Sequence, residues 1–198
     1  MIGVFSRGIL RIPNLVAFLG EEVRACSRLS SPRGLSAVAG WGLKPTARRA
    51  RAFAERHGLP YLGLEDGFLR SFGLAAAGAS PLSLVVDDLG VYYDATRPSR
   101  LERLLNEGPF TPALLAEAGQ ALEVLRREGL SKYNQALDAP AGALGEAPGR
   151  RVLVVDQTAG DAAIRYGLAS ESTFGRMLEA ARGENSDATI FVKTHPDV

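Results

Sequence analysis

Two acidic residues, a glycine and an arginine stand together in the segment LEDGFLRSFG, residues 64–73. Glu65 and Asp66 directly follow a predicted strand, and Gly67 permits a tight turn with close approach of a ligand. Neighbouring strand residues face opposite sides of a sheet, so only one of the two acids needs to face a cleft. Arg70 can bind a carboxylate or phosphate through two hydrogen bonds, and Ser71 adds a hydroxyl. The alternative is an acidic turn that caps the next helix.

A second candidate lies in TIFVKTHPDV, residues 189–198. The strand pattern runs into His195 and Pro196, and Pro196 ends the strand because it has no N–H to donate. In open α/β sheets, ligands bind at the carboxyl ends of strands. A phosphate would suit Lys193 and His195 there. The alternative is a histidine with a structural role.

Three further segments follow predicted strands. In VVDQTAGDAAIRYG, residues 154–167, Gln157 and Asp161 are typical of a loop that lines a substrate, although an Asx turn has the same residue types. Arg7 follows the first strand. Lys44 follows GWG, in which Trp41 fits either a core position or a platform for a sugar.

Other site classes find little support. Asp87, Asp88 and Asp94 do not have the spacing of an EF-hand loop and are more typical of a turn between strands. The motifs of nucleotide hydrolases, dinucleotide-binding proteins and serine hydrolases are missing from the sequence. The single cysteine, Cys26, has no partner for a disulfide, which favours a reducing cytoplasm. We expect no metal site and no cofactor.

The elements that position these residues alternate between strand and helix. Strands are predicted at residues 2–5, 35–40, 60–66, 82–87, 151–157 and 188–193, with a further short strand at 90–95. Helices are predicted at residues 13–28, 45–57, 98–107, 111–129 and 171–184. Ser99 and Thr111 are predicted helix caps, and Gly58 is a predicted C-terminal glycine.

This order predicts an α/β protein with two Rossmann-like domains, built on parallel sheets. Residues 1–137 form the first domain with its linking helices, 138–150 form a linker rich in Ala, Gly and Pro, and 151–198 begin a second domain. Two strands and one helix do not close a sheet core, so we expect the second domain to be incomplete in this chain.

Composition is that of a globular protein without a strong overall charge. Hydrophobic residues make up 46% of the 198 residues. The sequence contains 23 lysines and arginines and 22 aspartates and glutamates, and this near balance gives no indication of nucleic-acid binding. The first 20 residues lack the apolar core of a signal peptide. No apolar run approaches the length of a membrane span, although association with a membrane surface stays open.

Taken together, several sequence segments resemble those of one protein family. GWGLK, LPYLGLEDGFLRSFGL, PLSLVVDDLGVYYDATRPSRLE, VDQTAGD and FVKTHPDV occur in this order. They are similar to the bacterial capsular-polysaccharide β-Kdo transferases of the KpsC (LipA) type, over nearly the whole chain. They are also similar to bacterial sialyltransferases, which pair an acidic Gly motif with a His-Pro motif.

The resemblance implies a two-domain (GT-B) glycosyltransferase that moves Kdo from the donor CMP-β-Kdo to an oligo-Kdo linker on a lipid, with retention of configuration. It implies a peripheral location at the cytoplasmic face of the inner membrane, with capsule assembly proteins as partners. The first domain would hold the acceptor and the second the nucleotide sugar. The chain would be the front of an N-terminal module and inactive alone.

By the same resemblance, Asp66 is the carboxylate that captures the sugar, His195 assists the departing phosphate, and Glu65 positions or deprotonates the acceptor. Arg70, Arg7 or Lys44 would neutralise the sugar carboxylate, and Lys193 would assist His195. Other residues expected to bind substrate are Gly67, Ser71, Gln157, Asp161 and Pro196. Asp66 and His195 should face each other across one crevice. The alternatives are transfer of another CMP-linked acid such as sialic acid, and a non-catalytic scaffold.

Overall fold

The structure, a computed structural model, describes residues 1–71, 78–132 and 149–194, together with residues 140, 142, 145 and 147. Contacts divide the chain into two compact units. The first unit contains residues 1–92 and 97–136, and the second contains residues 93–96 and 137–198. The predicted boundaries at 137 and 150 stay predictions, since much of 133–148 lies outside the described residues.

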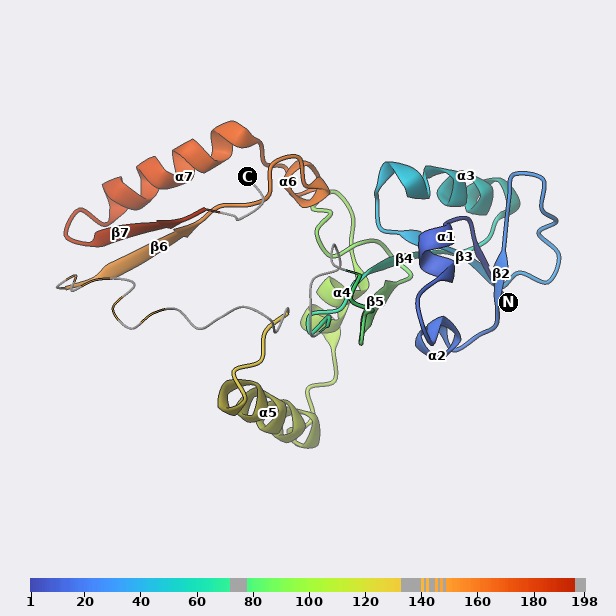
Figure 1. The fold of residues 1–198 in the computed structure, drawn as a ribbon, viewed down its shortest axis with the longest axis horizontal. Coiled ribbons are helices and arrows are strands. Elements are labelled where there is room, and N and C mark those ends of the chain that lie inside the picture. The colour runs from blue at the N-terminus through green and yellow to red at the C-terminus, as the bar shows by residue number, and fades with distance from the viewer. Residues whose placement is uncertain are drawn as a thin grey trace. The chain divides into compact units, whose positions relative to one another are not determined.

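The first unit is a mixed α/β unit (Figure 1). Its elements are β1 (Ile2–Val4), α1 (Arg7–Leu10), α2 (Leu15–Leu19), β2 (Val23–Ala25), β3 (Ala37–Trp41), the 3-10 turn η1 (Pro45–Ala47), α3 (Arg48–His57), β4 (Tyr61–Asp66), β5 (Leu84–Asp87), α4 (Arg100–Glu107) and α5 (Pro112–Arg127).

Its five-stranded sheet has the order β2-β1-β3-β4-β5. The first four strands are parallel, and β5 runs antiparallel to β4. The register places Val4 beside Ala39, and Trp41 beside Leu64. Because β1, β3 and β4 point the same way, the residues that follow them gather at one edge of the sheet.

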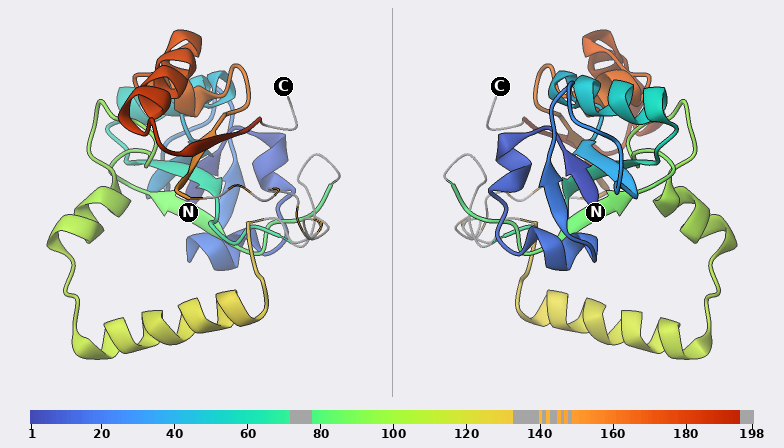
Figure 2. Two further views of the ribbon diagram at one scale, coloured as in Figure 1. Left: turned by 90° about the vertical axis from the view of Figure 1, so that its left-hand side faces the viewer. Right: turned by 90° about the vertical axis from the view of Figure 1, so that its right-hand side faces the viewer.

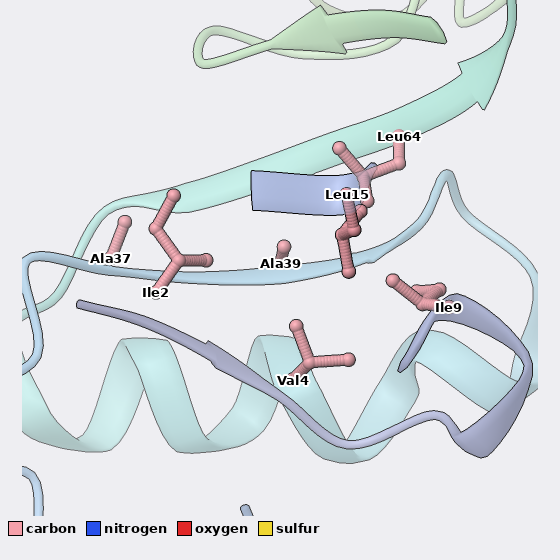
Figure 3. Close-up of a cluster of buried hydrophobic side chains, with 7 residues drawn as sticks. All are labelled: Ile2, Val4, Ile9, Leu15, Ala37, Ala39 and Leu64. Atoms are coloured by element: carbon pink, nitrogen blue, oxygen red, sulfur yellow. The ribbon is translucent and has the colours of Figure 1, made fainter. Parts of the chain in front are cut away.

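Helices cover both faces of this sheet (Figure 2). On one face, Ile9 of α1 and Leu15 of α2 pack with Val4, Ala39 and Leu64, all of them buried (Figure 3). On the other face, Ala50, Phe53 and Ala54 of α3 pack with Leu35 and Val38. The alternation of side chains along each strand therefore supplies both cores.

The predicted helix at residues 13–28 is wrong. The helix in this region is α2 alone, and Gly20 ends it with a φ of 71°, in the left-handed region that glycine adopts without strain. Val23–Ala25 instead forms β2, a parallel edge strand beside β1. The prediction counted Val23 as part of the apolar face of a helix, whereas Val23 packs against the core from strand β2.

The predicted parallel direction of the fourth strand is also wrong, because β5 pairs with β4 as an antiparallel partner. The further strand expected at residues 90–95 does not form. That segment turns instead, with the Asp94 carboxylate accepting hydrogen bonds from the Thr96 N–H and hydroxyl.

Helices α4 and α5 confirm the predicted caps. The Ser99 hydroxyl accepts from the Glu102 N–H at 3.1 Å, and the Thr111 hydroxyl accepts from the Leu114 N–H at 3.3 Å. Neither helix has a buried side chain. No helix in the described part of the chain combines the length and apolar character that crossing a membrane requires.

The second unit contains β6 (Arg151–Val155), α6 (Ala162–Tyr166), α7 (Glu171–Glu184) and β7 (Thr189–Lys193). The two strands are parallel, with Arg151 beside Thr189 and Val155 beside Lys193. Both strands and α7 were predicted. Residues 93–96 join this unit, because the Ala95 N–H donates to the Tyr166 carbonyl at 3.0 Å.

Replacing Asp88 by Asn should lower Tm slightly at pH 7 and leave it unchanged at about pH 2. Arg100 donates to both Asp88 oxygens, from Nε at 2.8 Å and from Nη2 at 2.7 Å. These hydrogen bonds lower the pKa of Asp88. A lowered folded-state pKa stabilises the fold above the unfolded pKa and ceases to do so as the pH falls through the folded value.

Thermal unfolding of the complete protein across this pH range measures the effect of Asp88→Asn. Glu123→Gln is the control, because it changes a carboxylate on exposed α5 for which no ion pair is found among the described residues. The effect is small because both partners are partly exposed. A Tm difference that persisted at pH 2 would contradict the assignment to this ion pair.

Candidate active site

A pocket of about 310 Å³ opens at the edge of the sheet where β1, β3 and β4 end. Its volume lies at the lower end of the range for small-molecule sites. The lining mixes apolar, hydroxyl and cationic side chains. The lining residues are Ser6, Gly8, Ile9, Ile12, Trp41, Lys44, Thr46, Arg70 and Pro81.

Asp66 adjoins this pocket through Arg70. The Arg70 Nε donates to the Asp66 Oδ1 at 2.7 Å. Asp66 is the last residue of β4, and alternation places its side chain on the same face as Leu62 and Leu64, which pack with α1 and α2. Asp66 therefore forms an ion pair beside a pocket and does not cap a following helix.

Gly67 is required by close packing at the end of β4. Its N–H donates to the Ser83 carbonyl at 3.2 Å. A Cβ at this position would come within 1.8 Å of the Ser83 Oγ and 2.9 Å of the Ser83 carbonyl carbon. The Ser83 hydroxyl also donates to the Leu69 carbonyl at 2.6 Å. Gly67 thereby lets β4 and β5 close the base of the loop that contains Arg70.

Lys44 and Arg7 place positive charge beside the pocket. Lys44 lines it, and its Nζ lies 5.9 Å from the centre of the Trp41 ring. Arg7 follows β1 and is exposed beside the lining residues Ser6 and Gly8. Such a pocket suits an anionic ligand.

Glu65 lies on the opposite face of the sheet from Asp66. Alternation places it with Tyr61, which packs on the α3 side. The pKa of Tyr61 is raised to about 12, chiefly by burial; the Arg51 charge acts to lower it and the Glu65 charge, to a smaller extent, to raise it. The Tyr61 hydroxyl donates to the Gly42 carbonyl at 2.9 Å. Glu65 is not among the residues that line the pocket.

Ser71 lies behind Arg70 and is 3% exposed. Its hydroxyl accepts from the Arg70 Nη1 at 2.8 Å. The structure therefore brings Asp66, Gly67, Arg70 and Ser71 together, with Lys44 and Arg7 around the same edge of the sheet.

The other predicted site residues belong to the second unit. The Asp161 carboxylate accepts from the Ala163 N–H at 2.8 Å and caps α6, as an Asx turn would. The Gln157 N–H donates to the Asp156 carboxylate at 2.8 Å. Lys193 is the exposed last residue of β7. His195 and Pro196 lie outside the described residues, so the shared crevice with Asp66 stays a prediction.

The aspartates at 87, 88 and 94 have structural roles. Asp87 is buried, and its carboxylate accepts from the N–H groups of Leu89, Gly90 and Arg100 at 2.8–2.9 Å. Within the described ranges, no group of three His, Cys, Asp or Glu residues is placed to hold a metal ion.

Several lining residues were not predicted from the sequence, among them Ile12, Thr46 and Pro81. Thr46 follows Pro45 at the start of the helix after β3, which is a signal that could have pointed to it. Ile12 and Pro81 have no such signal, because they reach the pocket from loops.

Residues 36–198 match the model of the family described as capsule polysaccharide biosynthesis protein. The chain belongs to this family. The matched residues include the whole segment from β3, through Asp66 and Arg70, to β7.

Two solved structures are similar to the chain. It is 53% identical to "Thermosulfurimonas dismutans KpsC, beta Kdo 2,4 transferase", with a TM-score of 0.89 over 99% of this chain. It is 29% identical to "Thermosulfurimonas dismutans KpsC, beta Kdo 2,7 transferase", with a TM-score of 0.64 over the full chain. The resemblance to the KpsC (LipA) type is confirmed.

Curated relatives agree with this assignment. The chain is 48% identical over 196 residues to "Capsule polysaccharide modification protein LipA" of Neisseria meningitidis serogroup A. It is 40% identical over 160 residues to "Lipopolysaccharide-processing protein LpsZ" of Rhizobium meliloti. The chain spans 27% and 36% of these two relatives, and 60% and 62% of the two solved chains.

Proposed function

We propose that this chain is part of a retaining glycosyltransferase that moves Kdo from CMP-β-Kdo to a lipid-linked oligo-Kdo acceptor in capsular polysaccharide biosynthesis. The observation that carries the proposal is the 53% identity to a KpsC β-Kdo transferase, with a TM-score of 0.89. The pocket beside the Asp66–Arg70 pair supports it, because a carboxylate and cations adjoin one small cavity.

We propose a two-domain arrangement of the GT-B type. Residues 1–137 form the acceptor-side domain, residues 138–150 link it, and residues 151–198 begin the domain that binds the nucleotide sugar. The parallel strands of each unit support this, because nucleotide and sugar sites lie at the carboxyl ends of such strands.

Asp66 acts as the nucleophile in two displacements. Its free carboxylate oxygen forms a bond to the anomeric carbon as the bond from that carbon to the CMP phosphate oxygen breaks, and CMP leaves with the electron pair. The acceptor hydroxyl oxygen then bonds to the same carbon, Asp66 leaves as a carboxylate, and the hydroxyl proton passes to solvent. Two inversions give net retention.

His195 and Lys193 are assigned to the departing CMP phosphate. A cationic or hydrogen-bonding group at this position stabilises charge that develops in the transition state. The leaving group is a monophosphate, so a bridging divalent metal is less necessary than for a diphosphate donor, and we expect no metal or other cofactor.

The pocket at the edge of the first sheet takes the terminal sugar of the acceptor. Its volume of about 310 Å³ suits a single sugar residue, and Trp41 offers an aromatic surface. Kdo has a carboxylate, and we assign its neutralisation to Lys44 and Arg7.

The reaction is proposed to occur at the cytoplasmic face of the inner membrane, where the protein is peripheral and meets the lipid acceptor and capsule assembly proteins. The linkage formed is proposed to be 2,4. This chain is 53% identical to the protein named a 2,4 transferase and 29% identical to the one named a 2,7 transferase.

The test compares CMP-Kdo with CMP-sialic acid as donors for the complete protein. Transfer is expected only with CMP-Kdo, to an oligo-Kdo acceptor, and NMR of the product should show a 2,4 linkage. Transfer or hydrolysis confined to CMP-sialic acid would overturn the choice of donor. A 2,7 product would overturn the linkage, and inactivity with both donors in the presence of acceptor would support the scaffold alternative.

A further inference from the structure

Arg70 is a buried charge whose hydrogen bonds are mostly made within the protein. It is 6% exposed. Its Nε donates to the Asp66 Oδ1 at 2.7 Å, and its Nη1 donates to the Ser71 Oγ at 2.8 Å and to the Ala79 carbonyl at 2.9 Å. A buried guanidinium is tolerated when it is paired and hydrogen-bonded in this way. The geometry is therefore set before any ligand arrives.

The backbone of Arg70 is held as firmly as its side chain. Its carbonyl accepts from the Leu82 N–H at 2.6 Å, and its N–H donates to the Lys132 carbonyl at 3.1 Å. Arg70 thus joins three parts of the first unit: the end of β4, the segment before β5 and the segment after α5. Groups fixed by several contacts hold a reacting partner accurately.

The contact leaves Asp66 with one oxygen held and one open. Oδ1 accepts from Arg70, and no donor to Oδ2 is found among the described residues. The hydrogen bond to Oδ1 fixes the rotamer of the Asp66 side chain. This rotamer in turn fixes the position of Oδ2. This is the arrangement that an attacking carboxylate requires.

We infer that Arg70 is a positioning residue, which acts through Asp66 rather than by binding the carboxylate of the sugar. The inference rests on the proposed function, in which Asp66 attacks the anomeric carbon. Arg70 lines the pocket, but its Nε and Nη1 are committed to the protein, and Lys44 is the cation of the pocket that does not contact Asp66.

Lysine cannot replace this arrangement, because its single ammonium lacks the planar fork that contacts Asp66, Ser71 and Ala79 together. Arg70→Lys in the complete protein should therefore lower kcat about 10²-fold and change the acceptor KM less than about threefold. The rate at which the sugar–Asp66 adduct forms, measured by mass spectrometry after rapid quenching, should fall by the same factor as kcat.

Lys44→Ala is the matched comparison, because it removes a cation of the same pocket. It should raise the acceptor KM and leave the rate of adduct formation unchanged. If Arg70→Lys behaved like Lys44→Ala, with a raised KM and unchanged kcat, the inference would be wrong and Arg70 would be a substrate ligand.

Ser71→Ala tests the same inference with a smaller change, in case Arg70→Lys does not fold. It removes one acceptor of the Arg70 Nη1 and should lower kcat about tenfold at constant KM. Unchanged kcat in Ser71→Ala would count against a positioning role. Failure of the proposed function has a separate signature, since Asp66→Asn would then retain transfer.

Discussion

Replacing Asp66 by Asn should reduce sugar transfer from CMP-Kdo by at least about 10³-fold, because an amide cannot form the covalent intermediate. The protein should still fold, but with a lower Tm, because the buried Arg70 loses its charged partner. The Asn side-chain oxygen can still accept from the Arg70 Nε, as the Asp66 Oδ1 does at 2.7 Å. Transfer is measured by chromatography of the labelled acceptor, and Tm is measured in parallel.

Asp88→Asn is the matched control for this substitution. It makes the same chemical change at a carboxylate that pairs with Arg100 and is not among the residues lining the pocket. Transfer by Asp66→Asn within about tenfold of the wild type would remove the nucleophile from the proposal and favour a scaffold. A sugar adduct on the Asp66 peptide of the wild-type protein that is lost in Asp66→Asn would directly support Asp66 as the nucleophile.

Gly67→Ala should lower the free energy of unfolding by about 1–3 kcal/mol and reduce transfer about 10²-fold. The new Cβ would meet the Ser83 Oγ at 1.8 Å, its Cβ at 2.7 Å and its carbonyl carbon at 2.9 Å. A side-chain rotation can relieve the first contact, but the last one requires the backbone of β4 or of the residue before β5 to move. Asp66 lies next to this displacement.

The control is Gly119→Ala in α5, where a Cβ would have no heavy atom within 4 Å. That change should raise stability by about 0.5–1 kcal/mol, because alanine favours a helix interior over glycine. Chemical denaturation of the complete protein and the transfer assay measure both variants. Equal stability and equal activity of the two variants would contradict the close packing at Gly67.

The edge of the sheet that contains the site was predictable from the sequence. β-Branched and apolar runs fixed β1, β3 and β4, and parallel strands bring the residues that follow them together. Alternation also predicted that one of Glu65 and Asp66 faces away from the cleft. Which of them does so depends on the face that Leu64 takes, and only the packed core decides this.

Other features depend on contacts that no local pattern encodes. β5 pairs antiparallel with β4 although residues 67–83 separate the two strands, a separation too long for a two-residue hairpin turn to signal the pairing. The Asp66–Arg70 pair is four residues apart but lies outside any helix, so helical spacing could not predict it. The edge strand β2 was missed because its valine also fitted a helical period.

The antiparallel return of β5 has a consequence for the length of the segment that joins it to β4. Residues 67 and 83 are hydrogen-bonded neighbours, so the excursion between them begins and ends at one point of the sheet. Lengthening it would cost little, since closure entropy grows slowly with loop size. An insertion between Ser71 and Ala79 should therefore leave the strand register and the Asp66–Arg70 ion pair in place.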